Sequence, residues 1–205
     1  IATNTDQQHL SITGADRKYM IGLDLTRGLG CGGYPTKGAE AAQESMTDIK
    51  DSLKESDMVF VCAGMGGGTG TGACHLIADI AKEVGALVIG VVTKPFLVEG
   101  KKRKNAAETG IIALKDCVDS LIAIPNQKLL TFASPTTSLL ETFQKADEVL
   151  LQAVKGISDL INEMGIINLD FADIKTIMTN QGLALMGTGS ATGEKRALEA
   201  ATNAI

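Results

Sequence analysis

The stretch Gly66-Gly67-Gly68-Thr69-Gly70-Thr71-Gly72 decides how this chain folds. A continuously apolar run, 58–63, precedes it, and a segment with apolar residues at helical spacing follows it. A glycine loop between a strand and a helix binds anions, because the bare backbone approaches a phosphate closely and the N–H groups of the helix start face it. No lysine follows Gly72, so this is not a Walker A loop, whose mechanism needs that cation. We predict a phosphate site, to which both threonines add hydroxyl donors; a plain turn is the alternative.

The composition is that of an ordinary globular chain. Its 205 residues are 44% hydrophobic and 21% charged, enough for one full core or slightly more. The formal net charge of −5 argues against a nucleic-acid partner, since neutralising phosphates needs a basic face. No apolar stretch approaches the ~20 residues of a membrane span, and the start does not resemble a signal peptide. We therefore expect no direct membrane insertion.

Cysteine and histidine offer little material for metal or redox chemistry. No short paired spacing links the four cysteines, which are Cys31, Cys62, Cys74 and Cys117. Reduced thiols in a cytosolic chain are expected and a zinc site is not, with Cys62 inside a strand of buried pattern. We expect His75 to be neutral and structural, because a cation near the start of a helix opposes its dipole.

Strands alternate with helices over the first part of the chain. Runs 58–63, 86–92 and 121–124 are continuously apolar, which predicts strands buried on both faces. Segments 36–56 and 101–119 carry apolar residues three and four apart, which predicts a helix over each. This order predicts an α/β, Rossmann-like fold with a mostly parallel sheet flanked by helices, whose ligands bind at the carboxyl ends of the strands.

After the third strand the alternation stops. One amphipathic pattern over 138–164 predicts a single long helix of roughly seven turns, which Gly156 would kink or thin. A short helix at 171–178, a glycine-rich strand at 182–189 and a last helix at 196–205 are expected to follow.

Several blocks beside the glycine loop resemble the FtsZ family, the tubulin-like cell-division GTPases of bacteria. These blocks are Asn4-Thr5-Asp6, Leu25-Thr26-Arg27-Gly28-Leu29-Gly30, Gly90-Val91-Val92-Thr93-Lys94-Pro95-Phe96, Ile124-Pro125-Asn126 and Asn168-Leu169-Asp170-Phe171-Ala172-Asp173. The resemblance implies a GTP-binding domain at 1–137, a central helix at 138–164, and an acidic loop with the start of a C-terminal domain at 165–205. The family has a further strand and glycine loop before the first block and a further sheet at the other end, so we expect the chain to be a fragment.

The resemblance also assigns a nucleotide site to separate segments. Phe143 would stack on guanine, while Asp147 and Asn126 would meet its polar edge; a buried acid would reject adenine, which lacks both donors. Glu99 would accept hydrogen bonds from the ribose, and Arg103 would contact a phosphate. From the residues alone, the last two form a helix-surface ion pair, Phe143 packs in the core, and Asp147 is a solvated residue.

A second glycine-rich segment lies at 28–35. The pattern G-x-G-x-x-G, a dinucleotide fingerprint, is met by Gly28, Gly30 and Gly33. The residues before it mix charge and polarity and make a poor buried strand, which that fingerprint requires. In the resembling family this loop, here with Gly32 and Gly33 as contacts, reaches toward the terminal phosphate. Tyr34 stands where the family commonly has Asn, which removes a compact donor; a flexible turn is the alternative.

Asp170 and Asp173 are the candidate catalytic residues. As plain structure, Asp170 caps the helix that follows and Asp173 favours its positive end. A long helix between them and the glycine loop would keep them away from the loop of their own chain. In the resembling family such acids enter the nucleotide pocket of the next subunit and polarise a water for attack on the γ-phosphate. Head-to-tail contacts of this kind build open filaments.

The resemblance thus implies a GTPase activated by self-assembly, with GTP or GDP and Mg²⁺ as cofactors. Asp6 is a candidate metal ligand, and the metal-binding residues are otherwise unknown. The implied setting is the midcell division ring in the cytoplasm of a bacterium or in an organelle, with membrane-tethering and regulatory division proteins as partners. The alternatives are a filament GTPase for DNA partition or cell shape, a nonhydrolysing nucleotide-binding scaffold, and a dinucleotide oxidoreductase. The isolated chain is expected to be poorly active.

Overall fold

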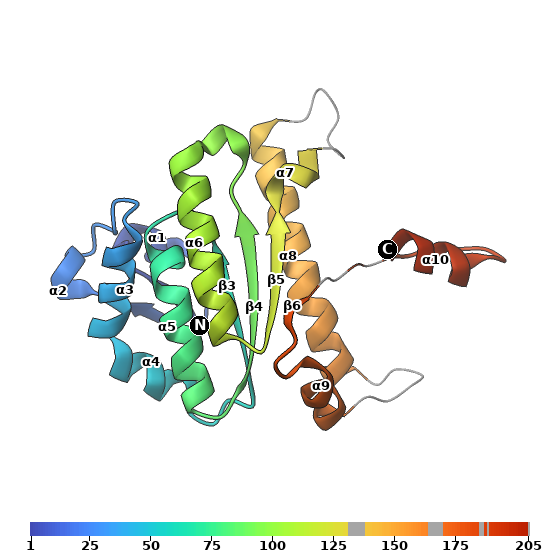
Figure 1. The fold of residues 1–205 in the computed structure, drawn as a ribbon, viewed down its shortest axis with the longest axis horizontal. Helices are drawn as coiled ribbons and strands as arrows, with labels where there is room; N and C mark the ends of the chain where they lie inside the picture. Colours follow the sequence, from blue (N-terminus) through green and yellow to red (C-terminus); the bar gives the residue numbers. More distant parts are fainter. Residues whose placement is uncertain (131–137, 164–169, 185–186, 188, 205) are drawn as a thin grey trace.

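A parallel sheet with helices on both faces forms the centre of the molecule (Figure 1). The structure, a computed structural model, describes residues 1–130, 138–163, 170–184, 187 and 189–204. The strands of this sheet pair in the order β3 (Met58–Gly64), β4 (Leu87–Lys94), β5 (Ser120–Pro125) and β6 (Gly182–Ala184). All three pairings are parallel, which confirms the predicted α/β class.

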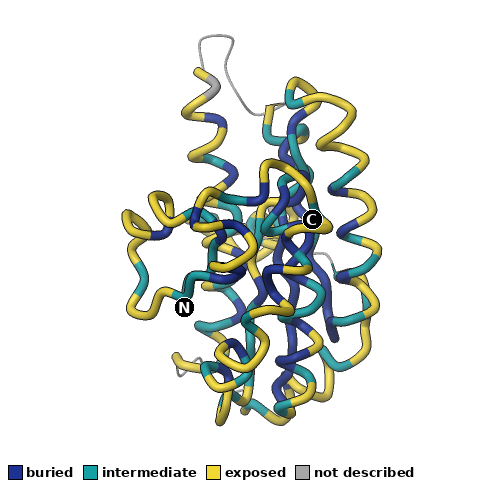
Figure 2. The backbone as a smooth tube through the Cα atoms, turned by 90° about the vertical axis from the view of Figure 1, so that its left-hand side faces the viewer, coloured by how far each residue is buried: buried dark blue, intermediate teal, exposed yellow. Residues whose placement is uncertain are grey.

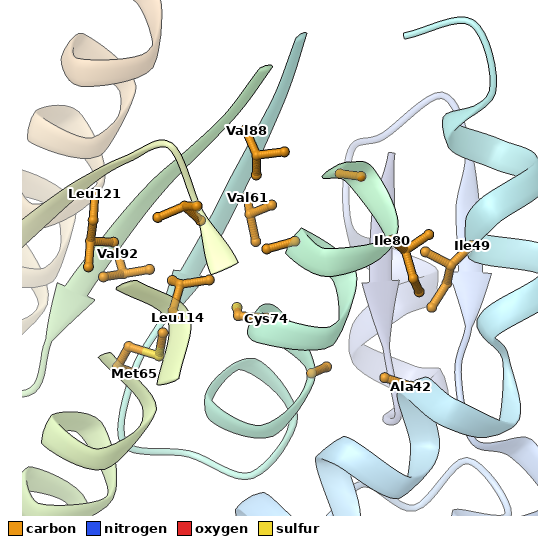
Figure 3. Packing of buried hydrophobic residues seen from close by; sticks show 14 of the residues in the cluster. Ala42, Ile49, Val61, Met65, Cys74, Ile80, Val88, Val92, Leu114 and Leu121 are labelled. Carbon is orange, nitrogen blue, oxygen red and sulfur yellow. The ribbon is translucent and has the colours of Figure 1, made fainter. Parts of the chain in front are cut away.

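Alternating residues of β4 build a separate core on each face of the sheet. Val88 and Val92 point to the cluster under α5 (Thr69–Glu83) and α6 (Lys101–Cys117), as Figure 3 shows. Ile89 and neighbouring strand residues meet α8 (Leu139–Asn162) on the other face. Burial on both sides explains why this strand reads as continuously apolar, and Figure 2 shows the buried residues gathered along the middle of the molecule.

The N-terminal residues form a second, smaller sheet. Here β1 (Ala2–Asn4) pairs in parallel with β2 (Lys18–Met20), and the short helices α1 (Gln7–Ile12) and α2 (Leu23–Thr26) accompany them. Within the described residues β1 and β3 do not pair with each other. A cavity of about 770 Å³ lies between them, lined by residues of both strands.

The burial predicted for the first of the three apolar runs is wrong. In β3 only Val61 is buried, and Cys62 is exposed. The physical reason is that β3 is the edge of the four-stranded sheet and borders the cavity, so one side of it has no covering element among the described residues. The other two runs, in β4 and β5, are buried as predicted.

The single helix predicted over 36–56 is also wrong, because two helices occupy it. They are α3 (Pro35–Glu44) and α4 (Met46–Leu53), and Ser45 separates them with non-helical backbone angles. The Ser45 hydroxyl accepts a hydrogen bond from the backbone N–H of Gly22, at 3.1 Å. A contact with a distant segment thus coincides with the break, which local periodicity does not reveal.

The later elements follow the predicted order. A capping box starts α8: the Ser138 hydroxyl accepts from the N–H of Glu141, whose carboxylate accepts from the N–H of Ser138. The helix runs on through Gly156 without a break, and α9 (Phe171–Met178) matches its predicted bounds. The ends predicted at 164 and 205, most of the strand predicted beyond 184, and the domain boundary at 137 fall on residues outside the described part of the chain.

Two more short elements and the last helix complete the chain. The turn η1 (Leu97–Glu99) follows β4, and α7 (Asn126–Leu129) follows β5. The final helix α10 (Arg196–Ala204) lies apart from the sheet (Figure 1). Within the described residues no helix is both long and apolar enough to cross a membrane.

Candidate functional site

The glycine loop lies at the carboxyl end of β3 and opens α5. Gly66 has φ +105°, a conformation that side chains rarely allow, and its N–H donates to the buried Thr71 hydroxyl at 2.9 Å. Gly68 is the N-cap of α5 and provides no side-chain cap. The first N–H groups of a helix have no acceptor within the helix, so this start is open to an anion.

Three of the loop's other glycines are required by close packing. A Cβ on Gly68 would lie 2.6 Å from the Cβ of Cys31, and one on Gly70 would lie 3.0 Å from the Gly64 carbonyl oxygen. A Cβ on Gly72 would overlap the Pro35 carbonyl oxygen. Gly67 is different, because a Cβ there would meet nothing within 4 Å. The glycine loop is therefore closely packed at Gly68, Gly70 and Gly72 and open at Gly67, which leaves room for a ligand.

Buried hydroxyl and thiol groups tie the loop to the N-terminal sheet. The Thr5 hydroxyl lies 2.7 Å from the Thr69 hydroxyl, and the Cys31 thiol lies 3.3 Å from the Thr5 hydroxyl. Thr5 has no exposed surface at all. Sequence reasoning assigned no positioning role to Thr5 or Cys31; the signal that could have found Thr5 is its place at the carboxyl end of a strand.

Segment 28–35 lies directly beside the glycine loop. Its four glycines all have positive φ, between 58° at Gly32 and 80° at Gly30. The residues before it form helix α2 and not a strand, which contradicts the dinucleotide fingerprint. The backbone N and O of Tyr34 would lie 3.1 and 3.2 Å from a Cβ on Gly68. The half-exposed Tyr34 ring also has two ammonium groups near its centroid, Lys102 at 5.0 Å and Lys37 at 5.8 Å.

Glu99 and Arg103, predicted to contact the ribose and a phosphate, form an ion pair with each other in this structure. Arg103 Nη1 and Glu99 Oε2 are 2.7 Å apart, and Glu99 Oε1 accepts from the N–H of Phe96. This is the ion pair that the four-residue spacing predicts. The neighbouring Lys104 lies 3.9 Å from Glu108, one turn further along α6. The backbone oxygen of Arg103 would lie 2.9 Å from a Cβ on Gly66, so α6 forms the other wall of the glycine loop.

The predicted base-binding residues collect at the same edge of the sheet. Asn126 begins α7 at the end of β5, is 5% exposed, and its Oδ1 has no hydrogen-bond partner among the described residues. Phe143 on α8 packs edge-to-face on Phe96, which follows β4, with centroids 5.0 Å apart and an interplanar angle of 86°. A buried unpaired amide oxygen is costly, so Asn126 is suited to receive a ligand donor.

Asp147 lies one turn after Phe143 on α8 and is exposed. This is the solvated position that its residue type alone suggests. The carboxylate of Asp147 is open to solvent in this structure. It could discriminate against adenine only if the bound base itself covered it.

The candidate catalytic acids lie at the opposite edge of the sheet. Asp170 caps α9, with its Oδ1 accepting from the N–H of Asp173 at 2.8 Å, as predicted. The Ser120 hydroxyl at the start of β5 donates to the Met178 carbonyl at the end of α9. A strand as long as β5 spans about 17 Å, so the acids and the glycine loop are not brought together within one chain. Figure 1 shows α9 far from the carboxyl ends of the strands.

The other side chains with potential chemistry either cap a helix or are buried away from solvent. Asp6 Oδ1 caps α1 by accepting from the N–H of His9, and its Cβ would lie 3.8 Å from a Cβ on Gly30. The described residues contain no group of three or more potential metal ligands. Burial raises the pKa of the Cys74 thiol to about 12, and the Nδ1 of His75 is buried with no partner in the described part of the chain.

The fold and the site define a nucleotide-binding class of α/β protein, and comparison with known proteins identifies it. Residues 1–134 match the model of the Tubulin/FtsZ family, GTPase domain. The chain therefore belongs to the Tubulin/FtsZ family.

Solved structures narrow the likeness further. An empty FtsZ dimer from M. jannaschii matches with a TM-score of 0.94 and 51% identity, covering 99% of this chain and 59% of that chain. A W319Y mutant of the same FtsZ matches equally well and is covered over 61% of its length. This chain therefore spans about three fifths of the length of the FtsZ chains that it matches.

More distant structures share the fold alone. CetZ1 from Haloferax volcanii, a GDP-bound monomer, has a TM-score of 0.76 and 24% identity, covering 93% of this chain and 58% of that chain. CetZ2 from the same organism, a GTPγS-bound protofilament, has a TM-score of 0.79 and 24% identity, covering 96% and 58%. The matched proteins named here are archaeal, so the bacterial setting suggested by the sequence blocks remains a prediction.

Proposed function

We propose that this chain carries the nucleotide half and the catalytic half of a GTPase whose active site forms between two copies. The observation that carries this proposal is the placement of the glycine loop and of Asp170 and Asp173 at opposite edges of one sheet. Stacking copies head to tail would bring the acids of one onto the loop of the next. Such heterologous contacts continue without closing and give filaments.

The nucleotide would lie along the carboxyl edge of the sheet. The open N–H groups at the start of α5 would bind its phosphates, Phe143 would stack on its base, and Asn126 would satisfy its unpaired oxygen on the guanine edge. Arg103 would reach a phosphate by exchanging its bond with Glu99, which would turn to the ribose. GTP and GDP are thus the proposed ligands.

Mg²⁺ would accompany the triphosphate. The cation usually takes one or two carboxylates beside phosphate oxygens and water. Asp6 fits that pattern, because one of its oxygens caps α1 while it lies beside the loop at 28–35. The ion would neutralise charge that develops on the phosphates, and Asp6 would hold it at the phosphate end.

The gap between β1 and β3 affects the activity that we expect of these 205 residues in isolation. Within the described part of the chain, both β1 and β3 have an unpaired side at the cavity between them. We propose that an extended segment outside the 205 residues fills this gap, and that 1–137, 138–164 and 165–205 are the domain divisions of a longer protein. The isolated chain would then bind GTP weakly.

In the cell, we propose a filament of the cytokinetic ring in the cytoplasm. The support is the 51% identity to FtsZ and the half-sites at opposite edges. Membrane-tethering and regulatory division proteins would be the other partners. A filament used for DNA partition or cell shape is the second candidate, because the same two half-sites would build a filament for either purpose.

The test is the dependence of turnover on protein concentration in the full-length gene product that contains this chain. We expect the rate of GTP hydrolysis per molecule to rise steeply with concentration and to parallel sedimentable polymer. A dilute monomer that hydrolyses GTP as fast per molecule as a concentrated sample would exclude a site shared between copies. Normal GTP binding with no turnover at any concentration would indicate a nonhydrolysing scaffold.

A further inference from the structure

Two lysine side chains converge on one aromatic ring at the mouth of the glycine loop. The ammonium of Lys102 lies 5.0 Å from the centroid of the Tyr34 ring, and that of Lys37 lies 5.8 Å from it. Within the described residues neither ammonium has an acidic partner, whereas the neighbouring Arg103 and Lys104 each pair with a glutamate. Two like charges beside one ring repel each other, and an anion bound between them would relieve that repulsion.

The contact bridges the two walls of the glycine loop. Tyr34 comes from segment 28–35, and its backbone adjoins Gly68. Lys102 comes from the start of α6, next to Arg103, whose backbone adjoins Gly66. The ring and the ammonium therefore meet across the loop that opens α5. Lys37 adds its charge from the first turn of α3.

We propose that Tyr34, Lys37 and Lys102 form a clasp over the terminal phosphate of a bound nucleoside triphosphate, and that the clasp makes the protein prefer triphosphate to diphosphate. This inference rests on the proposed function. A nucleotide bound at the start of α5 with its last phosphate toward segment 28–35 would bring charge to the two ammonium groups, whereas a diphosphate would leave them unmatched. Tyr34 acts as a positioning residue: its ring face holds the ammonium groups in place, and its hydroxyl makes no hydrogen bond within the described residues.

The clasp gives a role to the face of the Tyr34 ring, which has both ammonium groups beside it. The hydroxyl is dispensable on this view and the aromatic face is not. Exposure of Lys37 and Lys102 means that their replacement leaves the buried core untouched.

The experiment measures dissociation constants for GTPγS and for GDP in the full-length gene product. We expect Lys102→Gln, Lys37→Gln and Tyr34→Ala to weaken GTPγS binding by about three- to tenfold, with a smaller loss for GDP. Tyr34→Phe should retain the wild-type preference for GTPγS over GDP. Raising the salt concentration should shrink that preference in the wild type and change it little in a variant that combines Lys37→Gln with Lys102→Gln. Lys155→Gln on α8 is the control, because it removes the same charge from an exposed position outside the site.

Each outcome separates the clasp from the proposed function. A lower ratio of GTPγS to GDP affinity in the lysine and alanine variants, with Tyr34→Phe retaining it, supports the clasp. Equal losses for both nucleotides, or an unchanged ratio in every variant, overturn the clasp while guanine binding by the wild type still supports the proposed function. A wild type that binds neither nucleotide overturns both.

Discussion

The two edges of the central sheet are built in opposite ways. At the carboxyl edge, Gly66 is fixed by its backbone angle, Gly68 and Gly72 by close packing, and Thr5 by a fully buried hydroxyl. At the other edge, Asp170 and Asp173 are exposed and one capping hydrogen bond orders them. In the GTPase proposed above, the half-site that would bind the nucleotide is thus rigid in advance, while the half-site that would meet another molecule keeps its acids at the surface.

Mixing two inactive variants tests most directly whether the two ends of the sheet act together across molecules. Asp170→Ala removes a proposed catalytic acid and should lower GTP turnover by about 10²–10⁴-fold, and Asp147→Ala should lower it by weakening nucleotide binding. In an equal mixture about a quarter of the head-to-tail interfaces would join an intact pocket to intact acids. We therefore expect the mixture to recover a substantial part of wild-type turnover.

Asp170→Asn is the matched control for the acidic edge. Asparagine caps a helix as well as aspartate, so the loss of about 1 kcal/mol expected for Asp170→Ala should be absent, while turnover still falls. Failure of the mixture to recover activity would mean that the acids do not act on a neighbour's nucleotide. Thermal unfolding and turnover are measured on the same samples.

A pair of glycine substitutions sharpens the comparison at the other edge. Gly68→Ala should lower the free energy of unfolding by about 1–3 kcal/mol, because the added methyl meets Cys31 and the Tyr34 backbone. Gly67→Ala should change it by less than about 0.5 kcal/mol, since a Cβ there meets open space. Urea unfolding measures both. Equal effects would show that the loop is less tightly clamped than its packing indicates.

The Cys74 thiol, on the helix that follows the glycine loop, provides a pH-dependent test. Burial, with a smaller contribution from Cys62, raises the pKa of Cys74 to about 12, against about 8.5 for a free thiol. The folded state therefore favours the neutral thiol, and this stabilisation is present below about pH 8.5 and declines as pH rises toward 12. Between pH 8.5 and 10.5 the wild type should lose up to about 1.4 kcal/mol per pH unit more than Cys74→Ala. Parallel stability curves in urea would contradict this.

Local patterns predicted much of the fold. The strand, glycine loop and helix around 58–83 and the exact bounds of α9 follow from apolar spacing and a capping residue. The break at Ser45 was not predictable, because it involves an N–H from a distant segment. The partial exposure of β3 was not predictable from local sequence, because the burial of an edge strand depends on which elements lie beside it.

The candidate site was predictable only in part. Apolar patterns located the glycine loop, but Asn126, Phe143 and Asp147 came from resemblance to a family, since nothing local links them. The meeting of Tyr34 with Lys102 could not be predicted, because it joins segments far apart along the chain. Contacts between separate strand ends are a property of the tertiary structure.

Helix α8 has a consequence for how changes in the chain are tolerated. Its 24 residues make a rod of about 36 Å, which runs from the nucleotide edge toward the acids. Every inserted or deleted residue would alter that length by about 1.5 Å and turn all that follows by about 100°. Replacing its exposed side chains would do neither. In the filament proposed here, the spacing between successive molecules is thus encoded by the number of residues in one helix.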